Sequence, residues 1–313
     1  EVATDATFSH VVEQGEVEAS AETGVVTVDV TGLEPATRYW YRFETADGAS
    51  STVGRTHTLP GDGADRFRLA AVCCARFGQS EFGVYGAVAG ADVDLVLHLG
   101  DYVYEDAKWE LEGREPEPDH HCVTLDDYRT RHAQARRDPD LQALHAAHPM
   151  AVVWDDHDLA DNAWRGGAKG HDPDTQGPWA ERLDAALRAH QEFLPKRLAD
   201  PDDLSSAWRR LDGGDLFTVV CTEGRAQRDE QAGHEGSTDA DHPDRTMLGS
   251  TQARWLEEAV SGYPGRWVVL LTGTVLSELV IPAPDALDGA LPEKYAVVDG
   301  CATNTDQWDG YLA

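Results

Sequence analysis

The 313-residue sequence lacks any apolar run near the roughly 20 residues that a helical membrane span requires. It contains only four lysines, and its 26 basic residues stand against 57 acidic ones, for a formal net charge of −31. A field of that sign repels nucleic acid and anionic membranes. The sequence therefore predicts no membrane span and no nucleic-acid-binding surface, and an anionic substrate would need cations at its site.

Cysteine is scarce, and its spacing excludes two kinds of site. The cysteines are odd in number and include no CxxC pair: Cys73, Cys74, Cys122, Cys221 and Cys301. This pattern fits neither a disulfide framework nor a zinc ribbon. One of the five is therefore a candidate free thiol or metal ligand.

The amino-terminal part has the pattern of a small all-β unit. Val25–Val30 reads as a strand and Asp47–Gly48 as a hairpin turn. The residues leading to Tyr39 resemble the tyrosine corner of immunoglobulin-like and fibronectin type III sandwiches. We expect a partial immunoglobulin/fibronectin III-like β-sandwich over residues 1–60 and a linker over residues 61–66.

Residues 67–313 alternate strands with helices, which predicts an α/β core. The predicted strands cover residues 68–74, 94–99, 150–154, 216–221 and 267–272. The predicted helices cover residues 84–89, 124–137, 139–148, 178–194 and 248–260. Polar loops are expected over residues 105–122 and 227–245 and from Pro282 onward.

Three of the predicted strands end in, or lead directly into, side chains that can bind metal. The first ends in Cys73 and Cys74, the second leads into Asp101 and Tyr104, and the third leads into Asp155, Asp156, His157 and Asp158. The ends of neighbouring parallel strands meet at one edge of a sheet, where open α/β sheets bind ligands. Carboxylate and phenolate oxygens suit hard cations, and a thiolate adds affinity for iron or zinc. The sequence thus predicts a shared cation site of the kind used by two-metal phosphoryl hydrolases.

Read singly, these residues allow simpler interpretations. Asp101 could cap an ordinary strand-to-loop turn, Cys74 could be a buried apolar thiol, and Tyr104 could simply pack. Asp158 is better explained as a solvated or helix-starting acid than as a ligand. The acids Glu105 and Asp106 could help to hold a cation.

Five motifs, in order, resemble the PhoD-like (alkaline phosphatase D) family of calcineurin-type metallophosphoesterases. They are LHLGDYVYED, TLDDYRTRHAQARRDPDLQALHAAHPM, VVWDDHDLADNAW, LGSTQARWLEEAV and DQWDGY. The resemblance implies an α/β (α+β) metallophosphoesterase sandwich core over residues 67–313, preceded by a small all-β domain. It also implies a mixed site of Fe³⁺ and Ca²⁺ that hydrolyses phosphomonoesters and phosphodiesters.

The resemblance also assigns metal-binding roles to particular residues. Asp101 matches the carboxylate of the GD motif and would bridge metals, and Tyr104 would bind iron through its phenolate. Cys74 would be the thiolate ligand and Asp156 a carboxylate ligand. Asn162 matches the family's DN pair and is a weaker ligand candidate.

Catalytic and substrate roles follow from the same resemblance. His157 would face the phosphate, stabilising the transition state or protonating the leaving oxygen, and Asp101 is the second catalytic candidate. The segment CTEGR carries Glu223 where the family commonly has Asp, and it retains Arg225 as a substrate-binding candidate. Family members continue past WDGY into a GDxH segment that supplies further metal ligands, whereas nothing follows Ala313 here. We therefore expect either a fragment, with a truncated carboxyl end, or a variant with an incomplete site.

The preferred hypothesis is a metal-dependent phosphatase and phosphodiesterase that acts on small-molecule phosphate esters through a metal-activated hydroxide. Two alternatives remain open: a phospholipase D-like phosphodiesterase, and a metal-depleted surface binding module without activity. We expect a secreted, extracellular or periplasmic protein, because the family habit implies secretion. No signal-like segment is present, so any targeting peptide was removed or not included.

Overall fold

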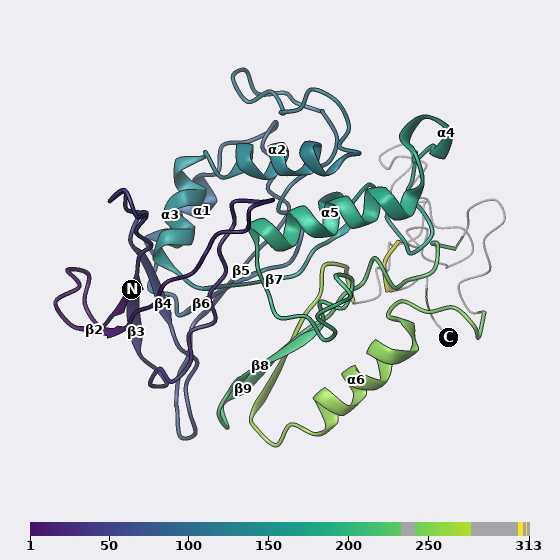
Figure 1. The fold of residues 1–313 in the computed structure, drawn as a ribbon. Coiled ribbons are helices and arrows are strands. Elements are labelled where there is room, and N and C mark those ends of the chain that lie inside the picture. Colours follow the sequence, from purple (N-terminus) through teal and green to yellow (C-terminus); the bar gives the residue numbers. More distant parts are fainter. Residues whose placement is uncertain (233–241, 277–305, 309–310, 312–313) are drawn as a thin grey trace, which may run out of the picture.

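The computed structural model describes residues 1–232, 242–276, 306–308 and 311. Within them the chain forms a four-stranded sheet near the amino terminus and two three-stranded sheets in the larger part (Figure 1). Most of the tail expected from Pro282, Cys301 included, and part of the loop expected over residues 227–245 lie outside the described residues.

The first three-stranded sheet is parallel throughout and has the order β5-β6-β7. Its strands are β5 (Leu69–Val72), β6 (Leu95–His98) and β7 (Met150–Val152). The crossovers between them contain α1 (Gly83–Ala89), α2 (Leu125–Ala135) and α3 (Pro139–Ala147). The βαβ rhythm predicted from the sequence is confirmed in this part of the chain.

The second sheet has the order β10-β9-β8, with β10 parallel and β8 antiparallel to β9. Its strands are β8 (Arg209–Gly213), β9 (Phe217–Cys221) and β10 (Trp267–Leu271). The helices of this half are α4 (Pro173–Gln176), α5 (Trp179–Phe193) and α6 (Gly249–Ser261), with α6 beside β9 (Figure 1). The sequence did not predict β8 or α4.

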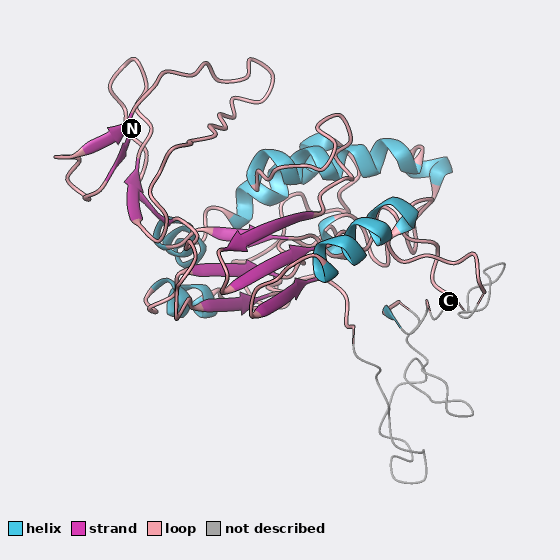
Figure 2. Cartoon of the chain, turned by 90° about the horizontal axis from the view of Figure 1, so that it is seen from below, coloured by secondary structure: helices cyan, strands magenta, loops and turns pink. Residues whose placement is uncertain are grey.

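The two sheets pack against each other through alternate residues of their strands. Leu95 and Leu97 of β6 join Val219 of β9 and Leu271 of β10 in one buried cluster between the sheets. Val96, between the two leucines, faces the opposite side and packs in the cluster that covers α1 and α3. This period-2 alternation builds a layered core with strands at its centre and helices outside (Figure 2).

Local sequence signals account for where the crossover helices begin. Thr124 and Asp127 form a reciprocal capping box at the start of α2. Asp138 caps α3, and Pro139 occupies its first turn, where no backbone donor is needed. These starts agree with the sequence-based prediction.

The first 60 residues form one antiparallel sheet of short strands, in the order β2-β1-β3-β4. The strands are β1 (Val2–Ala3), β2 (Val11–Glu13), β3 (Arg38–Tyr41) and β4 (Gly54–His57). The Tyr39 hydroxyl accepts a hydrogen bond from the Glu34 amide at 3.0 Å, which is the bond of a tyrosine corner. One sheet, not two packed sheets, represents the expected sandwich in these residues.

The prediction of a strand at Val25–Val30 is wrong. This segment has no strand partner, and Val28 is 46% exposed. Val, Thr and Ile favour strands because they pack on a pleated, half-buried surface. Without a neighbouring strand to supply that surface, the alternating pattern alone does not produce the structure.

The amino-terminal sheet contacts the core through β4 and α3. Arg55 Nε donates to the Ala147 carbonyl at 2.9 Å, and His57 stacks on Phe67 with ring centroids 5.7 Å apart. Phe67 in turn contacts Phe217 of β9, with ring centroids 5.0 Å apart.

No helix among the described residues is long and apolar enough to cross a membrane.

Candidate metal centre

The carboxyl ends of β5, β6 and β7 lie at one edge of their sheet, and the loops that follow carry the predicted site residues. The Cys74 amide donates to the Gly100 carbonyl at 3.3 Å, so the loops after β5 and β6 are in contact. Gly100 has φ of 104°, and a Cβ there would lie 2.4 Å from the Asp155 nitrogen. Only glycine lets the loop that carries Asp101 approach the loop after β7 this closely.

Three of the predicted metal ligands have a left-handed backbone. Cys74, Asp101 and Asn162 have φ of 57°, 51° and 52°, and they are three of the five non-glycine residues with positive φ in the described chain. Each such conformation costs about 1–3 kcal/mol, and surrounding structure must maintain it. Strain of this kind concentrates at functional sites, so its location singles out the same residues that the motifs did.

Three carboxylates converge at this edge. One oxygen each from Asp101, Asp155 and Asp156 lie within 4.8 Å of one another. Burial, and then the charges of Asp156 and Asp158, raises the pKa of Asp101 to about 7. Burial likewise raises the pKa of Asp155 to about 7. The ionised carboxylates of this cluster therefore repel one another, and a bound cation would reduce that repulsion.

The Tyr104 phenol lies against this cluster. Its hydroxyl donates to Asp101 Oδ2 at 3.0 Å, and its ring lies 4.5 Å from that of His157. Burial and then the Asp101 charge raise the pKa of Tyr104 far above its usual value, so without a cation it stays a phenol. Partial desolvation and then the Asp101 charge also raise the pKa of the Cys74 thiol. Cys74 is an exposed residue, so the interpretation of it as a buried apolar thiol is wrong.

His157 is held by a buried carboxylate. Its Nδ1 lies 2.7 Å from Glu105 Oε2, and its amide donates to Asp101 Oδ1 at 3.3 Å. Burial works to lower the pKa of His157, but the hydrogen bond and charge of Glu105, followed by Asp156 and Asp101, raise it to about 9. The imidazole is therefore positively charged near neutral pH, and its Nδ1 donates a hydrogen bond to Glu105.

A second group of possible ligand atoms shares Asp156 with the first. It comprises Asp156, His157 and Asp161, again within 4.8 Å of one another. The Asn162 amide donates to Asp156 Oδ2 at 2.8 Å, while its side-chain Nδ2 donates to Gln231 Oε1. Asn162 thus borders the site, and Asp156 is placed to serve both groups.

Arg225 supplies the positive charge nearest to the carboxylates. Its side chain is 3% exposed and forms ion pairs with Asp155, with Asp156 at 3.4 Å and with Asp306 at 2.9 Å. Burial would raise the pKa of Asp156, but Arg225 and then His157 keep it below its usual value. The guanidinium is therefore occupied by carboxylates, and binding a substrate would require it to exchange one of them.

The neighbouring acids have structural partners. Glu223 is buried and accepts from Trp154 Nε1 at 2.8 Å and from the amides of Arg225, Ala226 and Gln227. Asp158 ends the 3-10 helix η1 (Asp156–Asp158) and accepts from the Tyr102 and Val103 amides at 2.9 and 3.1 Å. Asp158 is fully buried, so the prediction that it could be a solvated acid is wrong.

The structure brings most of the sequence-predicted residues into contact with one another, but not all of them. Asp101, Asp156, Tyr104 and His157 are in direct contact or share a ligand group, whereas Cys74 belongs to neither ligand group of the described residues. Sequence reasoning named Glu105 only as an acid that could hold a cation, not as the partner of His157, and it missed Asp161 and Asp306. Asp161 stands beside Asn162 in the third motif, which is the signal that could have found it.

The donor set fits hard cations. Carboxylate oxygens and a phenol oxygen predominate among the possible donor atoms. The residues of this chain can therefore hold a metal ion, and the arrangement does not by itself select the element.

Comparison with known proteins agrees with the geometry. Residues 69–313 match the family described as PhoD-like phosphatase, and residues 1–60 match the PhoD-like phosphatase N-terminal domain. The chain is 33% identical to alkaline phosphatase D of Bacillus subtilis (strain 168), covering 100% of this chain and 53% of that protein.

A solved structure titled "Structure of PhoD" superposes with a TM-score of 0.85 at 31% identity, covering 99% of this chain and 59% of the other. The chain thus spans about half the length of the curated relative it matches. The matched families account for both the amino-terminal part and the larger core. This chain belongs to the PhoD-like phosphatase family.

Proposed function

We propose that this chain carries a metal-dependent phosphoesterase site that hydrolyses phosphomonoesters and phosphodiesters of small molecules, in a secreted or periplasmic protein. One observation supports this most directly: carboxylates of Asp101, Asp155 and Asp156 converge within 4.8 Å, at the strand ends where the family motifs lie. In a chain with a net charge of −31, such a cluster attracts a phosphate ester only when cations are bound.

Fe³⁺ and Ca²⁺ are the proposed metals. Asp101, Asp156 and Asn162 would hold them through oxygen, with Tyr104 as a phenolate ligand and Cys74 as a thiolate ligand of iron. Metal ions bound there would neutralise phosphate charge and lower the pKa of water, so that hydroxide attacks phosphorus in line.

His157 is the proposed acid. Glu105 holds its Nδ1, which leaves Nε2 to donate a hydrogen bond to a phosphate oxygen or a proton to the leaving oxygen. Asp101 orients the same residue by accepting from its amide. Arg225 remains a proposed substrate contact, and its ion pairs with Asp155 and Asp156 also limit the repulsion between these carboxylates.

The test compares the wild type with Asp101→Ala, and Asp126→Ala serves as a control on α2. The Asp126 side chain is 92% exposed and pairs only with Arg129 at 3.7 Å in the described structure. We expect iron and calcium in the purified wild type and turnover of bis-p-nitrophenyl phosphate. Asp101→Ala should lose both, and Asp126→Ala should keep both.

Three results would contradict the proposal. Unchanged turnover in Asp101→Ala would remove this residue from the mechanism. A wild type that retains no metal and hydrolyses nothing after metal addition would favour a binding module. Activity on phosphatidylcholine liposomes, with none on p-nitrophenyl phosphate, would favour a phospholipase D-like enzyme.

A further inference from the structure

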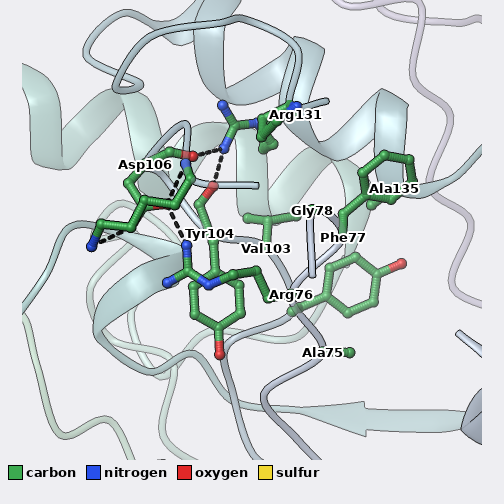
Figure 3. A pocket seen from close by; sticks show the side chains of 12 residues that line it. Ala75, Arg76, Phe77, Gly78, Val103, Tyr104, Asp106, Arg131 and Ala135 are labelled. Carbon is green, nitrogen blue, oxygen red and sulfur yellow. Dashed lines mark hydrogen bonds and ion pairs between the residues drawn. The ribbon is translucent and has the colours of Figure 1, made fainter. Parts of the chain in front are cut away.

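Arg76 lies face to face with Tyr104. It stands two residues after Cys74, in the loop that follows β5, and its guanidinium carbon is 3.8 Å from the centroid of the Tyr104 ring (Figure 3). The Tyr104 hydroxyl at the other end of the side chain donates to Asp101 Oδ2. One side chain therefore connects a fixed cation to the carboxylate cluster.

The position of Arg76 is fixed by an ion pair with Asp106. The side chains of Arg76 and Asp106 are 14% and 2% exposed, so water screens the pair poorly. Asp106 also accepts from the Lys108 amide at 3.1 Å and forms an ion pair with Lys108 Nζ at 3.2 Å. Because water is largely excluded, the interaction between Arg76 and Tyr104 should be among the stronger cation–π interactions.

The loop that carries Tyr104 does not depend on Arg76 for its backbone position. Arg131 of α2 donates to the carbonyls of Tyr104 and Asp106, and also to those of Glu117 and Pro118 at 2.9 and 2.8 Å. Arg131 lines the same small pocket as Arg76 and Tyr104 (Figure 3). Replacing Arg76 should therefore change the surroundings of the Tyr104 ring and leave the loop attached.

We propose that Arg76 is a positioning residue that holds the Tyr104 ring against the carboxylate cluster and tunes the energy of the ring's electrons. The inference rests on the proposed role of Tyr104 as a metal ligand. A guanidinium that stacks on an aromatic face lowers the energy of the ring's electrons, and it does so more for a phenolate than for a phenol. The ammonium of a lysine lacks the flat face needed for this stacking.

Visible spectroscopy gives a readout other than activity. A phenolate bound to ferric iron absorbs visible light by charge transfer from the ring to the metal. A cation closer to the ring than to the metal raises the energy of that transition. Removing the Arg76 charge should therefore move the band to longer wavelength.

The experiment records spectra of the ferric-loaded wild type, Arg76→Met, Arg76→Lys and Arg114→Met. Arg114 is a matched control, because its guanidinium carbon lies 3.8 Å from the Phe77 ring centroid and it pairs with Asp138 at 2.8 Å. Its side chain is 15% exposed, close to the value for Arg76. We expect a longer-wavelength band in Arg76→Met, a smaller shift in Arg76→Lys and no shift in Arg114→Met.

Each alternative outcome decides the question. A band at the wild-type wavelength in both Arg76 variants overturns the role of Arg76 and leaves the metal site intact. Equal shifts in Arg76→Met and Arg114→Met overturn it as well, because the effect is then not specific to Tyr104. A ferric wild type without the band overturns the phenolate ligand and the role of Arg76 together. If Arg76→Met does not fold, Asp106→Asn keeps the cation without its holding carboxylate and should still shift the band.

Discussion

Two buried regions of this molecule give histidine opposite charge states. The strand-end site comprises Asp101, Tyr104, Glu105, Asp155, Asp156 and His157, and here the pKa of His157 is raised to about 9. The histidine cluster comprises His98 at the end of β6 together with His132, His145 and His190; His98, His132 and His145 contact the Tyr102 ring, and His190 contacts His132. Burial lowers the pKa values of His98 and His132 to about 3, and His190 is also shifted well below the usual value.

The neighbours explain the difference. His157 contacts the Glu105 carboxylate, whereas His132 stacks on Phe193 at 5.1 Å and on Tyr102 at 5.9 Å. Neither ring nitrogen of His132 has a hydrogen-bond partner within the described structure. Burial, and then the nearby charges of Arg136 and Lys196, disfavour the charged form of His132, whereas acids beside the buried His157 favour its charged form. The strand-end site therefore keeps charged side chains that can bind a ligand, whereas the histidines of the histidine cluster are uncharged and belong to the core.

Removing the Arg225 guanidinium, which pairs with two carboxylates of the strand-end site, should have the largest effect on stability. Arg225→Met leaves Asp155 and Asp156 buried without their partner, and we expect a loss of about 3–5 kcal/mol in the free energy of unfolding at pH 7. Urea denaturation measures it. Arg188→Met removes an exposed pair with Asp184 and should cost no more than about 0.5 kcal/mol. Equal losses would show that burial does not separate the two pairs.

The pH dependence of stability should reveal His157 next. Its folded pKa is raised from 6.5 to about 9, so its contribution is fully present below pH 6.5 and is lost as pH rises through 9. The loss amounts to about 3 kcal/mol in metal-free protein. Unfolding at pH 6 and pH 9.5 with a chelator measures this. Glu105→Gln should remove most of the slope, and an unchanged slope would assign it to another group.

Calcium should stabilise the protein more at pH 8 than at pH 5. Asp101 and Asp155 have pKa values of about 7, so both are largely protonated at pH 5 and poor ligands. A hundredfold excess over the dissociation constant would add about 2.7 kcal/mol at pH 8. Thermal unfolding with and without Ca²⁺ checks this. Asp101→Asn should lose the gain, and an equal gain at both pH values would place the ion elsewhere.

The histidine cluster should show the smallest effect, with the opposite sign. The folded pKa of His132 is depressed to about 3, so its contribution is present above pH 6.5 and is lost as pH falls toward 3. His132→Phe removes two unpartnered nitrogens and should gain about 1 kcal/mol at neutral pH. The midpoint of acid unfolding should move to lower pH. His121→Phe, at an exposed position, should leave it unchanged.

Local signals predicted much of the fold. The capping box of Thr124 and Asp127 and the proline at position 139 place helix starts from residues within one turn of each other. Val25–Val30 failed because a strand depends on a partner that local sequence does not reveal. β8 was missed for the complementary reason, since Arg209–Gly213 is polar in pattern and pairs with the buried strand β9.

The candidate site shows the same division. The motifs located Asp101, Tyr104 and Asp156 at strand ends, because parallel strands in sequence order direct their carboxyl ends to one edge. They did not reveal that Glu105 faces His157 from 52 residues away. They also did not reveal that Arg225, 70 residues after Asp155, is enclosed by carboxylates.

The sequence by itself determined the acidic surface, the family motifs and the order of strands that brings metal-capable side chains together. Tertiary structure decided which histidines carry charge, which arginine faces the carboxylates and which faces Tyr104. The physical reason is that charge state depends on burial and on the distance to other charges. Those quantities arise only when segments far apart in the chain pack against one another.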